Sequence, residues 1–568
     1  MVNKQFILSG KDNGRVAVIS VSTSDALVDL KCRVASVFDV ASVEGISMHN
    51  PKGVAINAIE SIVNHDSEIR VKVDGKSIRS PCSLKRLPII GNYPGIYSGH
   101  MDNHERLFSR CGSVIKIMCM GAVVCLTNDP RICEMLLSEN DYFIRITSDL
   151  SHPLHFMKGK AALISYDSDA SAFKAAQKFI TPGISPRSSR RYADNIQQTI
   201  EGSFDVFDEI DRKDMTFPVY EYMVKIASQM VYRTCLGSDI GHFTTVNAPL
   251  HEIIHKFGEY TALLERTSIS PSWYKYLPYG KHRRLSKVKK RILALINEAI
   301  YNAETGGKGE DLPMREAALQ STCIADYLKR AVDEDGNKLP KEDMLKTMVV
   351  RVGAGFITTA SSLSWLIYSL THNLGTQERL LQELAESGAM PTRQWTYDEI
   401  TTLPFLDCFI KETHRMYNPG FQAAWSSKKD VIVPGGWLIP VNSVIIPTTL
   451  AIQQSKNYWE HPHIFDPDRW SDETANENKH RLTVTPFQAS LRGDDIVLFE
   501  TKLTIANLVW RYHFENDSRE PLEYDPESIL TRLLDYHVRA RKRTSWPEKL
   551  KAPKAANNVD GADTINKN

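Results

Sequence analysis

Cysteine is scarce in this sequence and absent from its last part. Nine cysteines stand at irregular spacing among 568 residues, without a C-x-x-C pair, and none follows Cys408. This distribution excludes a disulfide framework and a zinc site made of paired cysteines, and it fits a reducing compartment best. Any chemistry that needs a cysteine thiolate after Cys408 lacks its donor.

An excess of charge of one sign is also missing. Lys and Arg number 69 against 68 Asp and Glu, which gives a net charge of +1. No global field therefore attracts a polyanion, and we predict no nucleic-acid partner.

Long hydrophobic runs are few. The longest uncharged stretch, residues 352–370, is just long enough to cross a bilayer, but it is rich in Ser and Thr. We expect it to form a buried helix of the core. The chain starts with charged residues in a strand-like pattern, so we expect neither a signal peptide nor an N-terminal membrane anchor.

Two motifs in the second half of the chain form a recognisable pair. Residues 411–419 (KETHRMYNP) place Glu412 and Arg415 one helical turn apart, and residues 465–470 (FDPDRW) supply Arg469. Their order and spacing resemble the E-x-x-R and P-E-R-F segments of the cytochrome P450 family. The resemblance implies a buried structural ion network of Glu412, Arg415 and Arg469, in which every charge needs a partner.

Further segments match the same family. Residues 354–359 (AGFITT) are similar to the A-G-x-[DE]-T-T signature of the long helix that crosses the haem, where Thr358 would be the partner of bound oxygen. Residues 87–92 (LPIIGN) resemble the proline-rich hinge that opens the catalytic domain. The resemblance implies a haem cofactor, an NADPH-dependent P450 reductase as partner and a hydrophobic small-molecule substrate.

The loop that should ligate the haem iron departs from the family pattern. Family members read F-x-x-G-x-R-x-C-x-G, whereas residues 488–497 (QASLRGDDIV) are shorter and hold no cysteine, although residues 500–515 match the following helix well. The acidic pair 494–495 and His480 are not equivalent to a thiolate, which gives P450 haem its electron-donating push. We therefore predict no protein ligand for the metal, and Arg492 as a contact to a haem propionate.

Other positions change in the same direction. Ile357 replaces the family's acid that relays protons, and the threonine after it can equally hydrogen-bond its own helix. Phe173 and Gln177 stand where W-x-x-x-R contacts a propionate in the family, which leaves Lys174 or Lys178 as a cationic substitute.

Three functional hypotheses follow from this pattern. The first is a degenerate P450-fold protein, most similar to fungal P450s of secondary metabolism, with little or no monooxygenase activity. The second is an active monooxygenase that hydroxylates or epoxidises a hydrophobic small molecule and whose sequence, as given, lacks part of the haem loop. The third is a binding or scaffold protein that uses the P450 fold as a surface.

The first eighty residues have a pattern of their own. Residues 4–11 and 15–21 are typical of two strands joined by a hairpin turn, and residues 69–73 are typical of a closing strand. A helix lies between them, with Thr23 or Ser24 as its cap. Its expected buried face consists of Leu27, Leu30, Val34 and Val37.

This pattern resembles a ubiquitin-like β-grasp module. The segment runs on without the exposed Gly-Gly end that such modifiers use, so conjugation is not expected. Two interpretations stay open, a folding unit without a dedicated partner and a module that docks a protein partner.

The fold class that we predict is mainly α, a P450 fold with small β-sheets, preceded by a small α+β ubiquitin-like domain. The predicted boundaries are residues 1–78 for the ubiquitin-like domain, 79–547 for the P450-like domain and 548–568 for a disordered tail, since that tail is polar and lacks apolar periodicity. We expect a cytoplasmic protein or one peripheral to the endoplasmic reticulum.

Overall fold

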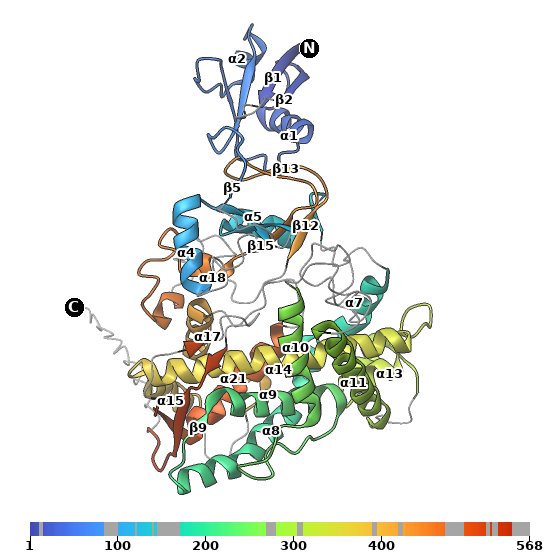
Figure 1. Cartoon of the computed structure of the whole chain (residues 1–568), viewed down its shortest axis with the longest axis vertical. Helices are drawn as coiled ribbons and strands as arrows, with labels where there is room; N and C mark the ends of the chain where they lie inside the picture. The colour runs from blue at the N-terminus through green and yellow to red at the C-terminus, as the bar shows by residue number, and fades with distance from the viewer. Residues whose placement is uncertain are drawn as a thin grey trace, which may run out of the picture.

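A β-rich N-terminal unit stands at one end of the molecule and a larger helical body at the other, with a layer of short strands between them (Figure 1). The computed structural model describes residues 1–8, 10, 15–83, 100–119, 122–138, 141–144, 171–268, 280–303, 310–388, 395–417, 424–471, 494–518, 523–524 and 532–547. The expected hinge at 87–92, the hairpin turn at 12–14 and the tail at 548–568 lie outside the described residues.

The N-terminal unit is a four-stranded sheet packed on one main helix. The strand order is β2-β1-β4-β3, with β1 antiparallel to β2 and parallel to β4. The elements are β1 Val2–Leu8, β2 Arg15–Val21, α1 Leu27–Phe38, β3 Ile46–His49, α2 Ile59–Val63 and β4 Ile69–Val73. Alternate side chains of β4 are buried, so the predicted closing strand is confirmed.

The start of α1 differs from the prediction. Its N-cap residue is Ala26, without a side-chain cap, so the predicted cap at Thr23 or Ser24 was wrong. The preceding residues form a turn instead, in which the Ser22 amide donates to the Asp25 carboxylate at 3.0 Å. This local hydrogen bond competes with an earlier helix start.

The buried face of α1 also differs at one position. Leu30 and Val34 are buried as predicted, but Val37 is 53% exposed and Phe38 takes its place in the core. Steps of four residues, from 30 to 34 to 38, keep to one face of a helix with 3.6 residues per turn. The predicted step of three from 34 to 37 turned away from that face.

A six-stranded sheet follows the N-terminal unit, in the order β5-β6-β7-β15-β12-β8. In the chain, helix α4 stands between β5 and β6 and helix α5 between β7 and β8. A separate hairpin, β13–β14, precedes β15. The bounds are β5 Cys82–Ser83, α4 His100–Cys111, β6 Val114–Cys119, β7 Ala122–Thr127, α5 Pro130–Leu137, β8 Phe143–Ile144, β12 Trp425–Ser427, β13 Val431–Val433, β14 Trp437–Ile439 and β15 Val444–Pro447.

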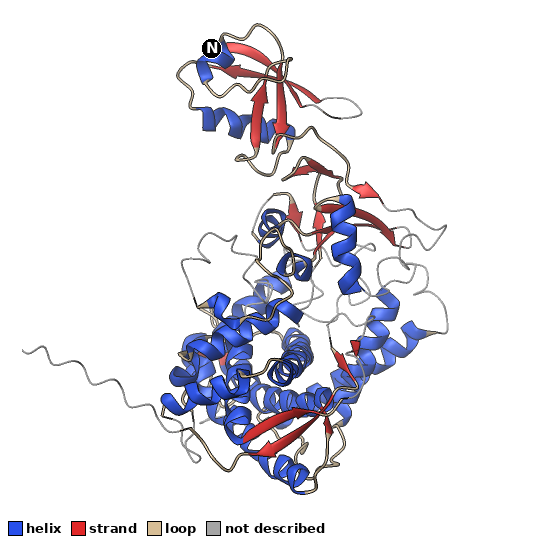
Figure 2. Ribbon diagram, turned by 90° about the vertical axis from the view of Figure 1, so that its left-hand side faces the viewer, coloured by secondary structure: helices blue, strands red, loops and turns tan. Residues whose placement is uncertain are grey.

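Helices make up most of the body (Figure 2). The longest of the described helices, α14, runs through its middle (Figure 1). The helices are α7 Ser171–Gly183, α8 Pro186–Arg212, α9 Val219–Leu236, α10 Glu252–Ser268, α11 Lys281–Asn302, α12 Met314–Gln320, α13 Ile324–Arg330, α14 Lys341–His372, α15 Thr376–Glu386, α16 Tyr397–Thr401, α17 Pro404–Tyr417, α18 Thr449–Gln453, η3 Pro467–Trp470 and α21 Asp494–Arg511. Small sheets complete it: β9 Phe217–Pro218, β10 Leu312–Pro313, β11 Ala331–Val332, β16 Tyr512–Asn516, β17 Glu523–Tyr524, β18 Leu533–Leu534 and β19 His537–Lys542.

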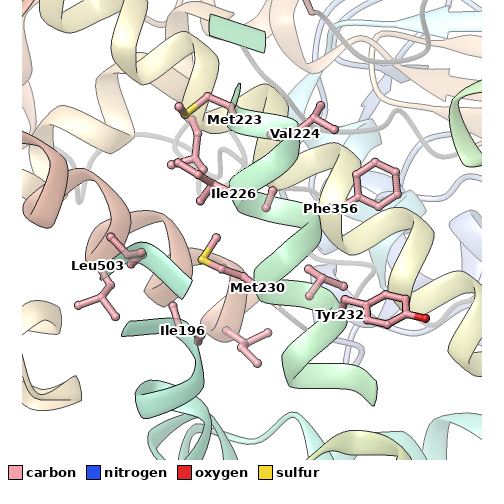
Figure 3. Packing of buried hydrophobic residues seen from close by; sticks show 14 of the residues in the cluster. Ile196, Met223, Val224, Ile226, Met230, Tyr232, Phe356 and Leu503 are labelled. Carbon is pink, nitrogen blue, oxygen red and sulfur yellow. The ribbon is translucent and has the colours of Figure 1, made fainter. Parts of the chain in front are cut away.

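The core of the body lies where α8, α9, α14 and α21 meet. Figure 3 shows Met230 of α9 among apolar side chains of its neighbours, including Ile196 of α8 and Leu503 of α21, all fully buried. Residues 352–370 belong to α14, and most of their side chains are buried in this core. In the part of the chain that is described, no helix combines the length and apolar character that crossing a membrane requires.

Hairpin β13–β14 joins the N-terminal unit to the body. Successive side chains of a strand point to opposite faces. Ile432 is fully buried in the core of the N-terminal unit, whereas Val431 and Val433 are buried in a cluster with the six-stranded sheet. The Ala41 amide donates to the Ile432 carbonyl, and the Ile432 amide donates to the Asp39 carbonyl, both at 2.9 Å. The strand thus belongs to two cores.

Charged and aromatic contacts extend this junction. The Gly435 amide donates to Asp74 Oδ2 at 2.7 Å, and Arg131 Nη1 lies 2.9 Å from the same oxygen. The Arg79 guanidinium lies over the Trp437 ring, 3.6 Å from its centroid. Asp74 and Arg79 therefore contact the hairpin at two positions, the Gly435 amide and the Trp437 ring.

Candidate functional site

Glu412 and Arg415 form a fully buried ion pair on α17. Both side chains have no exposed area, and Arg415 donates through Nε and Nη2 to the two Glu412 oxygens at 2.8 and 2.9 Å. Such a bidentate pair is the strong form of a charge-assisted hydrogen bond. The i,i+3 spacing on one helix places the two groups side by side.

The Glu412 carboxylate is the centre of a larger network. Its Oε1 accepts from Arg469 Nε at 3.0 Å and from the Asp466 amide at 2.9 Å, and its Oε2 accepts from Trp470 Nε1 at 2.9 Å. The structure therefore brings Glu412, Arg415 and Arg469 together. The indole and the backbone amide complete the set of partners, which repays the cost of burying the charge.

Arg415 also ties down the chain that follows β15. Its Nη1 donates to the Gln453 carbonyl at 2.8 Å, and its guanidinium lies 5.3 Å from the centroid of the Trp459 ring. The network thus holds residues 449–470 against α17, a structural role that needs no cofactor.

Thr358 lies on α14 with its hydroxyl turned to its own helix. The hydroxyl donates to the Ala354 carbonyl at 2.9 Å, with the Gly355 carbonyl at 3.4 Å. Ile357, at the position of the family's acid, packs against the hydrophobic core. This stretch of α14 therefore presents no acidic side chain, and its threonine satisfies a helix carbonyl.

Aromatic side chains of α10 and α14 pack closely beside this stretch. The rings of Phe257 and Phe356 lie 5.8 Å apart in an edge-to-face arrangement. A Cβ at Gly353 would stand only 2.5 Å from the Phe257 ring, so only glycine fits there without movement. The absent side chain allows α10 to rest on α14.

The cationic substitutes on α7 are both exposed. Lys178 Nζ lies 3.5 Å from Asp333 Oδ2. Its charge is therefore directed to the residues after β11. The Gln177 carbonyl accepts from the Thr181 hydroxyl at 2.7 Å, as an ordinary helix residue does.

Residues 488–493 of the shortened loop, which include Arg492, lie outside the described residues, and so does His480. Residues 494–497, which we expected to belong to the loop, form the first turn of α21 instead. The described chain resumes with α21, where Glu500 is 2% exposed. Burial raises the pKa of Glu500 to about 7, against an opposing effect of the Arg351 charge. The last cysteine, Cys408, is on α17 and half-buried, and burial raises the pKa of its thiol.

Sequence reasoning missed several members of the buried network and one buried carboxyl group outside it. Trp470 lies within the matched 465–470 segment, but a motif does not reveal that its indole nitrogen donates to Glu412. The Gln453 carbonyl had no signal, because a backbone acceptor leaves no trace in the sequence. The full burial of Glu500 could have been suspected from its apolar neighbours in residues 496–499.

Comparisons with known proteins agree with this architecture. A family model described as Cytochrome P450 matches residues 81–538. Cytochrome P450 monooxygenase alnD of Emericella nidulans is 42% identical over 552 residues, which are 96% of this chain and 99% of that protein. Cytochrome P450 4X1 of Homo sapiens is 24% identical over 418 residues, 71% of this chain and 78% of that protein.

Among solved structures, the haem domain of cytochrome P450DA is similar, with a TM-score of 0.71 at 17% identity, covering 82% of this chain and 99% of that one. This likeness confirms the predicted fold class, mainly α with small β-sheets. The alignment with the fungal relative covers 96% of this chain, so about 23 of the 568 residues lie outside it. That is fewer than the N-terminal unit has, so the relative shares at least part of this unit.

Proposed function

Because this chain belongs to the cytochrome P450 family, we propose that it is a P450-fold protein that keeps the scaffold and has lost thiolate-dependent monooxygenase activity. The observation that carries the proposal is the absence of any cysteine after Cys408. The family's haem is held by a cysteine thiolate from the loop before the helix that α21 represents. The chain has no such residue to offer there.

The family implies a haem cofactor, but the donor set of this chain does not fit a thiolate-ligated haem. Hard carboxylates, as at 494–495, do not replace a soft thiolate that donates electron density to iron. Among the described residues, no three His, Cys, Asp or Glu side chains gather as a metal site.

The motifs of the fold are kept while those of the chemistry are changed, which supports the same proposal. Residues that stabilise the fold, Glu412, Arg415 and Arg469, are in contact. Residues that handle protons in the family are changed, as at Ile357. Loss of one function with retention of the scaffold predicts this division, whereas random decay would affect both.

The test is the spectrum of the full chain expressed with added haem. We expect no thiolate-type band in the reduced, carbon-monoxide-bound state, while circular dichroism shows a folded helical protein. Cytochrome P450 monooxygenase alnD, 42% identical, is the matched positive control under the same conditions. A thiolate-type band from this chain would refute the proposal.

A second candidate function is an active monooxygenase whose loop is incomplete in the given sequence. The observation in its favour is the alignment over 99% of a relative named as a monooxygenase. Sequencing the transcript from residue 486 to 500 decides between the two, because a cysteine codon there would restore the ligand. The protein would then oxidise a hydrophobic small molecule with electrons from an NADPH-dependent reductase, in secondary metabolism.

We further propose that residues 1–78 are a ubiquitin-like domain with a structural role. The strand order β2-β1-β4-β3, with β1 and β4 parallel in the middle and α1 across one face, supports a β-grasp. The burial of Ile432 in its core supports the body of this same chain as its partner. A separate protein partner would bind the opposite, exposed surface, where Val18 is 67% exposed.

A further inference from the structure

Two cysteine thiols meet at the junction between the N-terminal unit and the body. Cys82 Sγ lies 2.8 Å from Cys111 Sγ, although 28 residues separate them in sequence, and both thiols are reduced and partly exposed. A disulfide bond is about 2.0 Å long, so the two sulfur atoms need to move by less than about 1 Å to form one.

The fold explains why these two residues meet. Cys82 begins β5, which runs parallel to β6 with Cys82 opposite Ile115. Cys111 ends α4, and Gly112, at a φ of 87°, turns the chain into β6. The end of α4 and the start of β5 are therefore neighbours because both border the same strand (Figure 1).

We propose that Cys82 and Cys111 form a reversible disulfide, with a small-molecule disulfide such as oxidised glutathione as the oxidant. Cys82 attacks the oxidant as a thiolate and releases one glutathione thiolate, which forms a mixed disulfide. Cys111 then attacks the Cys82 sulfur and releases the second glutathione. The two protein thiols lose two electrons and two protons in all, and one glutathione disulfide becomes two glutathione thiols.

The roles of the two thiols follow from their surroundings. Burial, and then the neighbouring Cys82, raise the pKa of Cys111 to about 11. Cys111 is therefore protonated at neutral pH, and the first attack falls to Cys82. Once Cys82 is held in the mixed disulfide, Cys111 gives up its proton to solvent and attacks the Cys82 sulfur as a thiolate.

The disulfide would form beside the contacts between Trp437 of the hairpin and the two segments that carry the cysteines. Arg79, three residues before Cys82, covers Trp437 and exchanges backbone hydrogen bonds with Gly436 and Leu438 at 2.9 and 3.0 Å. On the other side, Trp437 Nε1 donates to Ser113 Oγ at 3.2 Å, two residues after Cys111. A cross-link between the two segments fixes both sides of the indole, so oxidation is expected to stabilise the docked position of the N-terminal unit.

The first test is peptide mapping of the full chain after incubation in glutathione buffers of rising oxidising potential. Trypsin releases residues 80–85 and 111–116, each with a single cysteine. We expect these peptides to appear linked, and the link to vanish with dithiothreitol. Exposed Cys32 reports that the oxidant acted, because it takes up glutathione. Glutathionylated Cys32 beside two free thiols at Cys82 and Cys111 would overturn the proposal.

Variants separate the cross-link from its effect. Cys82→Ser and Cys111→Ser should each abolish the linked peptide, whereas the matched Cys408→Ser should form it as the parent chain does. Hydrogen exchange at the amides of Arg79 and Leu438, which donate across the junction, should slow by about tenfold or more on oxidation of the parent chain and remain unchanged in the two variants. Linked peptides without slower exchange would refute the stabilisation of the junction.

Discussion

At the residue scale, the strongest constraint on this fold is one carboxylate. Glu412 accepts hydrogen bonds from two guanidinium groups, an indole and a backbone amide, and it has no exposed area. A buried charge of this kind is tolerable only while all its partners remain, because water cannot replace any of them. It therefore ties the stability of the fold to the charge on a single side chain.

Glu412→Gln should cost about 3–5 kcal/mol of unfolding free energy, because it leaves the buried Arg415 without a counter-charge. Thermal or urea unfolding followed by circular dichroism measures the change. Glu460→Gln is the control, since the Glu460 side chain is 92% exposed and its ion pair is a long one, with 3.9 Å between Glu460 Oε1 and His461 Nε2. A loss below about 1 kcal/mol for Glu412→Gln would show that the network contributes little.

Burial shifts the pKa values of two other groups in opposite directions. Burial raises the pKa of Glu500 to about 7 and lowers the pKa of His414 to about 3. The folded chain therefore binds the Glu500 proton more tightly than the unfolded chain does, and the His414 proton less tightly. Stability falls as pH rises from about 4.5 to 7 through Glu500, and rises between about pH 3 and 6.5 through His414.

Replacement of Glu500 by Gln separates these effects, since a neutral amide mimics the protonated acid. The variant should gain stability relative to the parent chain as pH rises from 5 to 8, up to about 3 kcal/mol, because the parent must then bury a charge. Urea unfolding at both pH values measures this difference. Glu334→Gln, at an exposed position, is the control: its unfolding free energy should differ from that of the parent chain by the same amount at pH 5 and at pH 8. A difference for Glu500→Gln that is independent of pH would contradict the assignment.

At the scale of elements, the packing of α10 on α14 depends on a missing side chain. Gly353 faces Phe257 so closely that a methyl group would stand 2.5 Å from the nearest ring atom. The ring is buried and cannot swing aside freely, so any substitution must move one helix from the other.

Gly353→Ala should therefore destabilise the body by about 1–3 kcal/mol, although alanine favours a helix. On α10, Gly258→Ala is the matched control, because nothing stands within 4 Å of its Cβ, and it should gain roughly 0.5–1 kcal/mol. Thermal unfolding distinguishes the two signs. Adding Phe257→Leu to Gly353→Ala should recover part of the lost stability, because the smaller side chain makes room for the methyl group. A double variant no more stable than Gly353→Ala would place the strain elsewhere.

Sequence patterns were sufficient for elements whose signal is local. The strand at 69–73 alternates, so it could be read directly. The triad of Glu412, Arg415 and Arg469 was expected from the resemblance of two short motifs to a family, and the three side chains are in contact. The position of β13–β14 could not, because Ile432 pairs with Val40 across nearly four hundred residues and no periodicity encodes such a contact. The start of α1 was missed since a single turn hydrogen bond outweighed a favourable cap residue.

At the scale of the whole molecule, the N-terminal unit and the body are one structure with two cores. Strand β13 contributes Ile432 to one core and its two neighbours to the other. The sequence suggests a domain boundary near residue 78. The hydrophobic packing does not respect this boundary, because Ile432 lies in the core of the N-terminal unit.

Ile432→Ala should destabilise the distant N-terminal unit by about 2–5 kcal/mol, because it opens a cavity among side chains of that unit. Hydrogen exchange at the amides of β1 and β2 should quicken. Ile464→Ala, at a position that is 58% exposed, is the control and should leave this exchange unaltered. Unchanged protection in Ile432→Ala would show that the unit is stable without the hairpin.

The shared strand also sets an order in time. A ribosome adds Ala41 long before Ile432, its hydrogen-bonded partner. At about 5–20 residues per second, the 391 residues from 42 to 432 take roughly 20–80 s to make. During that interval the core of the N-terminal unit lacks the side chain of Ile432. We therefore expect the nascent N-terminal unit to be open to chaperones that bind exposed apolar surface until Ile432, in the last quarter of the polypeptide, completes its core.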